Sequence, residues 1–197
     1  MAKVKQLIAE RRMDMFLDLH NPAPGDPTFF YILDNSLHPA ATIALRDRFI
    51  ELAYGRISKI KPLIPMSNKP KTTGPNYHPL WKQISANWVC MNGNPQTVSV
   101  CLETIWNYKN CTTEGYRAVG ANIAAAVREF LAERVLVAHA DRYGGAGDRK
   151  RLWAVGASRE VRQRDLQLAH YPAHAGRHEL AERHQVRLAV ILLGRVA

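Results

Sequence analysis

The sequence predicts one α/β domain followed by an extension of different composition, and three observations support this. The chain has 197 residues, which is enough for one domain with a substantial core and short for two. Apolar runs typical of buried strands occur at 15–20, 29–33 and 97–104, and helical patterns lie between and after them. The composition then changes after residue 134.

The first elements alternate between helix and strand. Val4, Leu7 and Ile8 are spaced for one face of a short helix, which leads into the strand MFLDLH at 15–20. A Pro/Gly-rich turn follows, and FFYIL at 29–33 has the aromatic and apolar character of a second buried strand. A helix feeding a strand in this way indicates the α/β class.

The next helix is expected over TIALRDRFIELAYG, with Leu45, Phe49 and Leu52 on one face and Gly55 as its end. Residues 56–79 contain five prolines and a glycine, so they predict a long loop rather than a regular element. Loops of this length in compact domains are commonly lids, binding loops or disordered segments, so this one is a candidate to cover a substrate.

The last predicted elements are a strand and the clearest helix of the chain. The strand is TVSVCLET at 97–104. The helix lies within NCTTEGYRAVGANIAAAVREFL, where Thr112 or Thr113 can cap its start and Glu114 favours the N-terminal end of its dipole. Its apolar stripe comprises Tyr116, Val119, Ile123, Val127, Phe130 and Leu131.

Charge and cysteine content limit the class of protein. A net charge of +10 suits a polyanionic partner, but no sequence motif of a nucleic-acid-binding fold is present, so nucleic acid is not expected. Three cysteines without a CxxC pair predict neither a disulfide framework nor a cysteine zinc site, which fits a reducing compartment. The chain shows no signal peptide, and its apolar run at 188–194 is too short to span a bilayer. We therefore expect a soluble cytoplasmic protein without a membrane partner.

The composition break defines two parts, 1–134 and 135–197. The second part carries one Lys, ten Arg and five of the eight His. We expect it to be a poorly packed, Arg/His/Ala-rich extension, disordered or translated in an altered frame. His170, His174 and His178 recur every four residues there, but Pro and Gly between them predict adventitious metal affinity rather than a built site.

A histidine and a carboxylate stand at the exit of the first strand. Side chains alternate along a strand, so Asp18 and His20 project to one face, and His20 falls where the strand ends. Open α/β sheets bind ligands at the carboxyl ends of their strands. A neutral imidazole there can bind zinc with Asp18 as the acceptor for its other nitrogen. The alternative is a hydrogen-bonded histidine without a ligand.

A glutamate ends the strand at 97–104. Ser99, Cys101 and Glu103 alternate with apolar residues, which puts Glu103 on the less apolar face of a strand that otherwise reads as buried. A buried carboxylate is costly unless it is paired or near a metal. Beside a zinc-bound water it can act as a general base; the alternative is a salt-bridged or rim-exposed glutamate.

Together the two segments resemble a known family. FLDLHNPAPG is similar to the strand of zinc carboxypeptidases that delivers their third zinc ligand, and SVCLETIWN is similar to the later strand with their catalytic glutamate. The helix after that glutamate also fits, so the resemblance covers roughly residues 5–133. It implies a mixed sheet flanked by helices, a Zn²⁺ cofactor, and removal of a C-terminal residue from a peptide substrate.

On this resemblance, His20 binds zinc, Glu103 activates the water, and Tyr77 corresponds to a tyrosine of a mobile loop that closes over the substrate. The alternative for Tyr77 is a loop tyrosine packed on the surface. The family's first two zinc ligands form a His-x-x-Glu motif upstream, followed by an Asn-Arg segment. Only 19 residues precede His20, and neither motif is among them. We therefore expect a C-terminal half-domain, weak or inactive alone, whose partner is the N-terminal half.

Two other functions fit the same sequence. A zinc amidohydrolase acting on N-acyl amino acids would use His20 and Glu103 in the same roles with a different pocket. A basic, non-catalytic binding protein would use the Arg-rich segment DRKRLWAVGASREVRQR at 148–164. Chelator-sensitive hydrolysis favours the enzymes, whereas binding with a steep salt dependence favours the binding protein.

Overall fold

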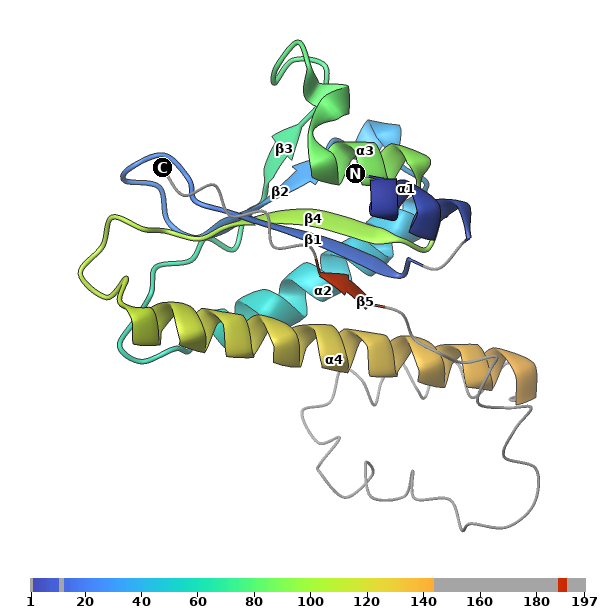
Figure 1. Cartoon of the computed structure of the whole chain (residues 1–197). Helices are drawn as coiled ribbons and strands as arrows, with labels where there is room; N and C mark the ends of the chain where they lie inside the picture. The colour runs from blue at the N-terminus through green and yellow to red at the C-terminus, as the bar shows by residue number, and fades with distance from the viewer. Residues whose placement is uncertain (1, 11–12, 144–187, 191–197) are drawn as a thin grey trace. The chain divides into compact units, whose positions relative to one another are not determined.

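A computed structural model describes residues 2–10, 13–143 and 188–190. In this part of the chain a mixed β-sheet is packed with helices, which confirms the predicted α/β class (Figure 1). The chain divides into two units: the first comprises residues 1–127 and 187–197, and the second begins at Arg128, within the last helix of the described residues. The sheet and the site described below belong to the first unit.

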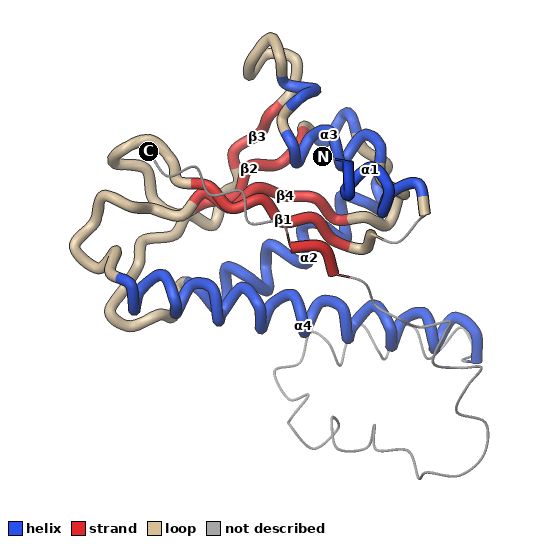
Figure 2. The backbone as a smooth tube through the Cα atoms, in the orientation of Figure 1, coloured by secondary structure: helices blue, strands red, loops and turns tan. Residues whose placement is uncertain are grey.

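Figure 2 distinguishes the helices from the strands. The helices are α1 (Ala2–Ala9), α2 (Ala40–Ile57), α3 (Ser85–Asn92) and α4 (Thr113–Tyr143), with short 3-10 turns at Asn35–Leu37 and Trp81–Gln83. The strands are β1 (Met15–His20), β2 (Phe29–Leu33), β3 (Lys71–Thr73), β4 (Val98–Glu103) and β5 (Leu188–Val190).

The described strands form one sheet in the order β3-β2-β4-β1-β5. β1 runs parallel to β4 and to β5, β2 runs antiparallel to β4, and β3 runs parallel to β2. The parallel pair β1 and β4 is the centre of the fold, since all six residues of β1 lie opposite residues of β4. Apart from Leu19 and His20 at its end, β1 is buried, as is all of β4.

Helices cover both faces of the sheet (Figure 1). On one face, α1 and α3 pack over β1 and β4 through a cluster of buried side chains: Val4, Met13, Phe16, Ala86, Val89 and Cys101. On the other face, α2 packs its Phe49 ring edge-on against Phe30 of β2, with the centroids 5.9 Å apart. The two central strands are therefore shielded from water on both sides, which explains their apolar sequences.

The structure corrects three predicted details. α2 continues past Gly55 to Ile57, because a glycine within a helix weakens it without necessarily ending it. Leu45 and Leu52 are only half-buried, since α2 turns a face with Phe49 and Ala53 toward the core. The predicted loop at 56–79 contains β3, a short strand of polar residues that no apolar pattern reveals.

Of the two predicted capping residues of α4, Thr112 is confirmed: it accepts a hydrogen bond at Oγ1 from the backbone N–H of Gly115, with an N···O distance of 3.1 Å. α4 runs past the composition break at residue 134 to Tyr143. Most of the predicted extension 135–197, including the histidine repeat and the segment 148–164, lies outside the described residues. The predictions for those segments therefore stay predictions.

Cys90, Cys101 and Cys111 are free thiols. Among the described residues, no helix is both long enough and apolar enough to cross a membrane.

Candidate metal centre

The candidate site lies at the carboxyl ends of β1 and β4. Because these strands are parallel, both ends reach the same edge of the sheet, and the register places His20 directly opposite Glu103. Past the strands, the backbone N–H of Thr104 donates to the carbonyl of His20 at 2.7 Å. The sequence prediction that His20 and Glu103 each lie at a strand end agrees with this geometry.

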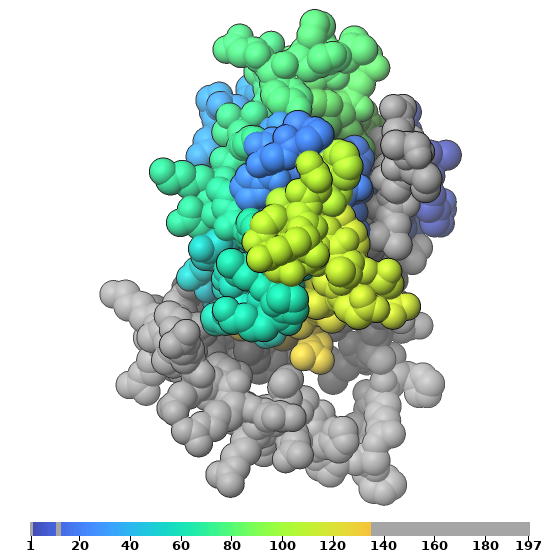
Figure 3. Space-filling model, turned by 90° about the vertical axis from the view of Figure 1, so that its left-hand side faces the viewer, coloured from blue at the N-terminus to red at the C-terminus, as the bar shows by residue number. Residues whose placement is uncertain are grey.

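The two loops that leave this edge are tied together. The side chain of Asn21 donates from Nδ2 to the carbonyl of Thr104 at 2.8 Å, and Trp106 Nε1 donates to the carbonyl of Pro22 at 2.8 Å. Figure 3 shows the loop after β1, in blue, beside the loop after β4, in yellow-green. These bonds fix the position of the backbone that carries His20 and Glu103.

Asp18 lies beside His20 on the same face of β1. Its Oδ1 is 3.1 Å from His20 Nε2, and its Oδ2 accepts a hydrogen bond from the hydroxyl of Ser85 in α3. Asp18 is buried, whereas the side chain of His20 is 48% exposed. Ser85 therefore holds the Asp18 carboxylate within the protein, while the imidazole of His20 reaches solvent, as expected for a carboxylate that orients a histidine.

Glu103 and Cys101 lie on the same face of β4. Glu103 is buried, and burial raises the pKa of its carboxyl above the ordinary value, against the opposing effect of nearby His20. The Cys101 thiol lies 3.8 Å from Glu103 Oε1, and burial together with the negative charge of Glu103 raises the pKa of this thiol. Glu103 Oε2 is buried and has no hydrogen-bond partner among the described residues.

The predicted loop tyrosine lies near this cluster but outside it. The ring of Tyr77 packs edge-on against Tyr31 of β2, with centroids 5.3 Å apart, and its side chain remains about half exposed. Tyr31 lies opposite Cys101 in the sheet. Burial, followed by the effects of Tyr77 and Glu103, raises the pKa of the Tyr31 hydroxyl. Tyr31 is thus the connection between Tyr77 and the candidate centre.

Cys101 is the member of the site that the sequence prediction missed. One ligand atom each from His20, Cys101 and Glu103 lies within 4.8 Å of the others. Counting cysteines for CxxC pairs cannot find such a site, because the three residues come from two strands. The available signal was the alternation of β4, which puts Cys101 and Glu103 on one face.

The resemblance to zinc carboxypeptidases implies zinc, and the described residues fit it in part. Imidazole, thiolate and carboxylate are all zinc ligands, and the buried oxygen Glu103 Oε2 has no hydrogen-bond partner in the described structure, so a cation there would satisfy it. In the carboxypeptidase arrangement, however, only His20 is a ligand here, whereas a catalytic zinc takes three protein ligands and a water. Zinc at this edge would be held by His20 and would activate a water.

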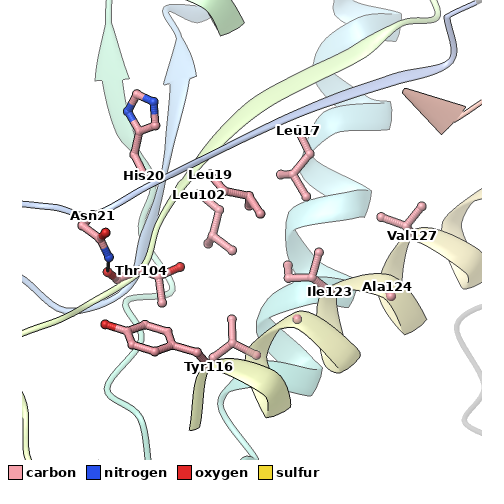
Figure 4. A pocket seen from close by; sticks show the side chains of 12 residues that line it. Leu17, Leu19, His20, Asn21, Leu102, Thr104, Tyr116, Ile123, Ala124 and Val127 are labelled. Atoms are coloured by element: carbon pink, nitrogen blue, oxygen red, sulfur yellow. Dashed lines mark hydrogen bonds between the residues drawn. The ribbon is translucent and has the colours of Figure 1, made fainter. Parts of the chain in front are cut away.

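A separate cavity lies on the opposite face of the sheet, between β1, β4 and the first half of α4. Its volume is about 580 Å³, and most of its lining is apolar. Figure 4 shows Leu17, Leu19 and Leu102 pointing from the strands toward α4, while His20 points to the other side. His20 and Tyr116 are also among the residues that line the cavity, so it reaches the end of β1 that carries the candidate centre, and Tyr116 adds an ionisable hydroxyl to its lining.

Comparisons with models of protein families, with curated protein sequences and with solved structures found no match.

Proposed function

We propose that the edge formed by β1 and β4 is the site of a zinc-dependent hydrolase of the carboxypeptidase type, which releases C-terminal residues from peptides. The observation that carries the proposal is the pairing of His20 with Glu103 at the carboxyl ends of two adjacent parallel strands. A metal ligand and a general base must lie side by side to act on one water, and the position of His20 opposite Glu103 supports these roles.

In the proposed reaction, each residue of the site has its own role. His20 holds the metal, and Asp18 orients its imidazole from 3.1 Å. Glu103 accepts the proton of the attacking water and can return it to the leaving amine. When bound, zinc would polarise the carbonyl of the substrate and lower the pKa of a bound water. In this proposal Tyr77 contacts the substrate, which its half-exposed side chain beside Tyr31 supports.

The proposal includes low turnover. His20 is the one ligand that the carboxypeptidase arrangement finds among the described residues, so a zinc held there is more open and less well fixed than a catalytic zinc with three protein ligands. A loosely held metal positions its water poorly, and small misplacements cost large factors in rate. Slow but chelator-sensitive hydrolysis is therefore the expected behaviour.

The experiment is a hydrolysis assay on the full chain with added Zn²⁺. N-blocked dipeptides with a free C-terminal carboxylate, the same dipeptides as C-terminal amides, and N-acyl amino acids are incubated with it, and released amino acids are measured by mass spectrometry. We expect release from the free-carboxylate dipeptides, little release from the amides, and none with a chelator. Release from N-acyl amino acids in preference to dipeptides would instead identify an amidohydrolase.

Glu103→Gln and His20→Ala are the decisive variants, with Glu51→Gln as a control because Glu51 is exposed on α2, paired with Arg48. Loss of a general base lowers such rates by about 10²–10⁴-fold, so Glu103→Gln should reduce release to the background. Wild-type release no greater than that of Glu103→Gln would overturn the proposal, whatever the binding of zinc.

A further inference from the structure

We infer that His20, Cys101 and Glu103 form a three-ligand site for a thiophilic divalent cation, zinc above all, with Cys101 binding the metal as a thiolate. The inference rests on the proposed function for the role of His20 and extends it. It adds Cys101 as a ligand, and it makes Glu103 complete the ligand set when no substrate is bound.

The first support is the placement of the three ligand atoms. Parallel pairing of β1 and β4 puts His20 opposite Glu103, and Cys101 lies two residues before Glu103 on the same face. One ligand atom from each residue lies within 4.8 Å of the others. Ligand atoms of one tetrahedral zinc ion are separated by distances of about 3–4 Å, so small side-chain rotations bring this set around one ion.

The second, independent support is a buried carboxylate oxygen that lacks a hydrogen bond. Glu103 is 8% exposed, and its Oε2 has no hydrogen-bond partner in the described structure. The hydrogen-bond donor to Glu103 Oε1 is the weak thiol of Cys101, 3.8 Å away. Asp18 adds a second buried carboxylate, whose Oδ1 lies 3.1 Å from His20 Nε2. A buried carboxylate without a strong donor is stabilised by a cation.

The donor types select the metal. Thiolate and imidazole favour zinc and cobalt over magnesium and calcium, which require six or more oxygen ligands. On binding, the Cys101 S–H bond breaks, a sulfur–metal bond forms, and the proton passes to solvent, while His20 binds as neutral imidazole. The thiolate and the Glu103 carboxylate then balance the charge of the divalent ion. The half-exposed His20 provides access from solvent.

Cobalt(II) tests the site directly, because a cobalt–thiolate bond gives a strong near-ultraviolet charge-transfer band. Only a cysteine can supply the thiolate, so histidines elsewhere in the chain cannot produce the band. The cysteines of the chain are Cys90, Cys101 and Cys111, and all three are among the described residues. We expect the band in the full wild-type chain and in Cys90→Ser, and its loss in Cys101→Ser and His20→Ala. Absence of the band in the wild type, or its survival in Cys101→Ser, would overturn the inference.

Two further measurements keep the test independent of folding defects and of the hydrolysis assay. Zn²⁺ should raise the melting temperature of the wild type and raise that of Cys101→Ser much less; equal shifts would overturn the inference. By chelator competition, Cys101→Ser should bind zinc at least about tenfold more weakly. If it binds zinc normally while Glu103→Gln abolishes hydrolysis, the inference fails and the proposed function stands. If the cobalt–thiolate band is present but no hydrolysis is detected, the inference stands and the proposed function fails.

Discussion

Replacement of Glu103 by Gln should stabilise the metal-free protein at neutral pH, because the buried carboxylate is poorly satisfied. Glu103 Oε2 has no hydrogen-bond partner in the described structure, and Oε1 has only the thiol of Cys101 at 3.8 Å. Leaving one buried acceptor unsatisfied costs about 1–3 kcal/mol, and more when the group is charged. Gln has nearly the same shape and no charge, so we expect its free energy of unfolding to exceed that of the wild type by about 1–3 kcal/mol.

The pH dependence of this difference identifies its cause. Burial raises the pKa of Glu103 in the native state above the ordinary value of 4.5, which applies to the unfolded chain. Between the two values the native state binds more protons than the unfolded state, so the wild type loses stability as the pH rises through that interval. Gln does not titrate. The advantage of the variant should therefore be full above the raised pKa and vanish below pH 4.5.

Urea unfolding at about pH 8 and about pH 4, with a chelator to remove metal ions, measures both quantities. Glu51→Gln is the matched control, since the side chain of Glu51 is 70% exposed and its replacement should change stability by less than about 0.5 kcal/mol at either pH. A Glu103→Gln variant no more stable than the wild type at about pH 8 would refute the reasoning. So would an advantage that is the same at both pH values.

Three other predictions concern zinc binding, the reactivity of a cysteine and the packing of a glycine. Asp18→Asn should weaken zinc binding by about 10–100-fold in chelator competition, because Asp18 lies against His20; unchanged affinity would show that Asp18 does not orient the ligand. Burial raises the pKa of Cys90 to about 11 from 9.0, so its thiolate fraction at about pH 8 should be roughly a hundredfold lower and its alkylation correspondingly slow; labelling as fast as that of a small-molecule thiol would contradict this. Gly115→Ala should destabilise the fold by about 1–3 kcal/mol in urea unfolding, since a Cβ there meets the carbonyl of Asn110, whereas Gly120→Ala, with open space around it, should not; equal effects would contradict the packing.

The main strands and helices follow from the sequence because their signals are local. β1, β2 and β4 show as apolar runs, and the start of α4 shows through Thr112, which caps it. β3 gives no such signal, since its residues are polar and it forms by pairing with β2. Helix ends are also set by tertiary contacts, which explains why α2 passes Gly55.

The candidate site was predictable to the extent that strand alternation and strand ends define it. That reasoning places Asp18 and His20 on one face and Glu103 at a strand end, as the structure does. Alternation also puts Cys101 on the face of Glu103, but it could not supply Cys101 as a neighbour of His20 or Ser85 as a neighbour of Asp18, because those distances depend on the register of β1 against β4 and on the packing of α3. Long-range pairing of this kind leaves no trace in local sequence spacing.

The central claim, that His20 holds zinc at this edge, is tested most directly by measuring zinc affinity in the wild type, His20→Ala and His78→Ala. His78 is a matched control, because it lies in the loop after β3 and accepts a hydrogen bond at Nδ1 from the backbone N–H of Leu80. We predict that the tightest zinc site weakens at least about tenfold in His20→Ala and stays unchanged in His78→Ala. Equal zinc affinity in the wild type and in His20→Ala would contradict the account.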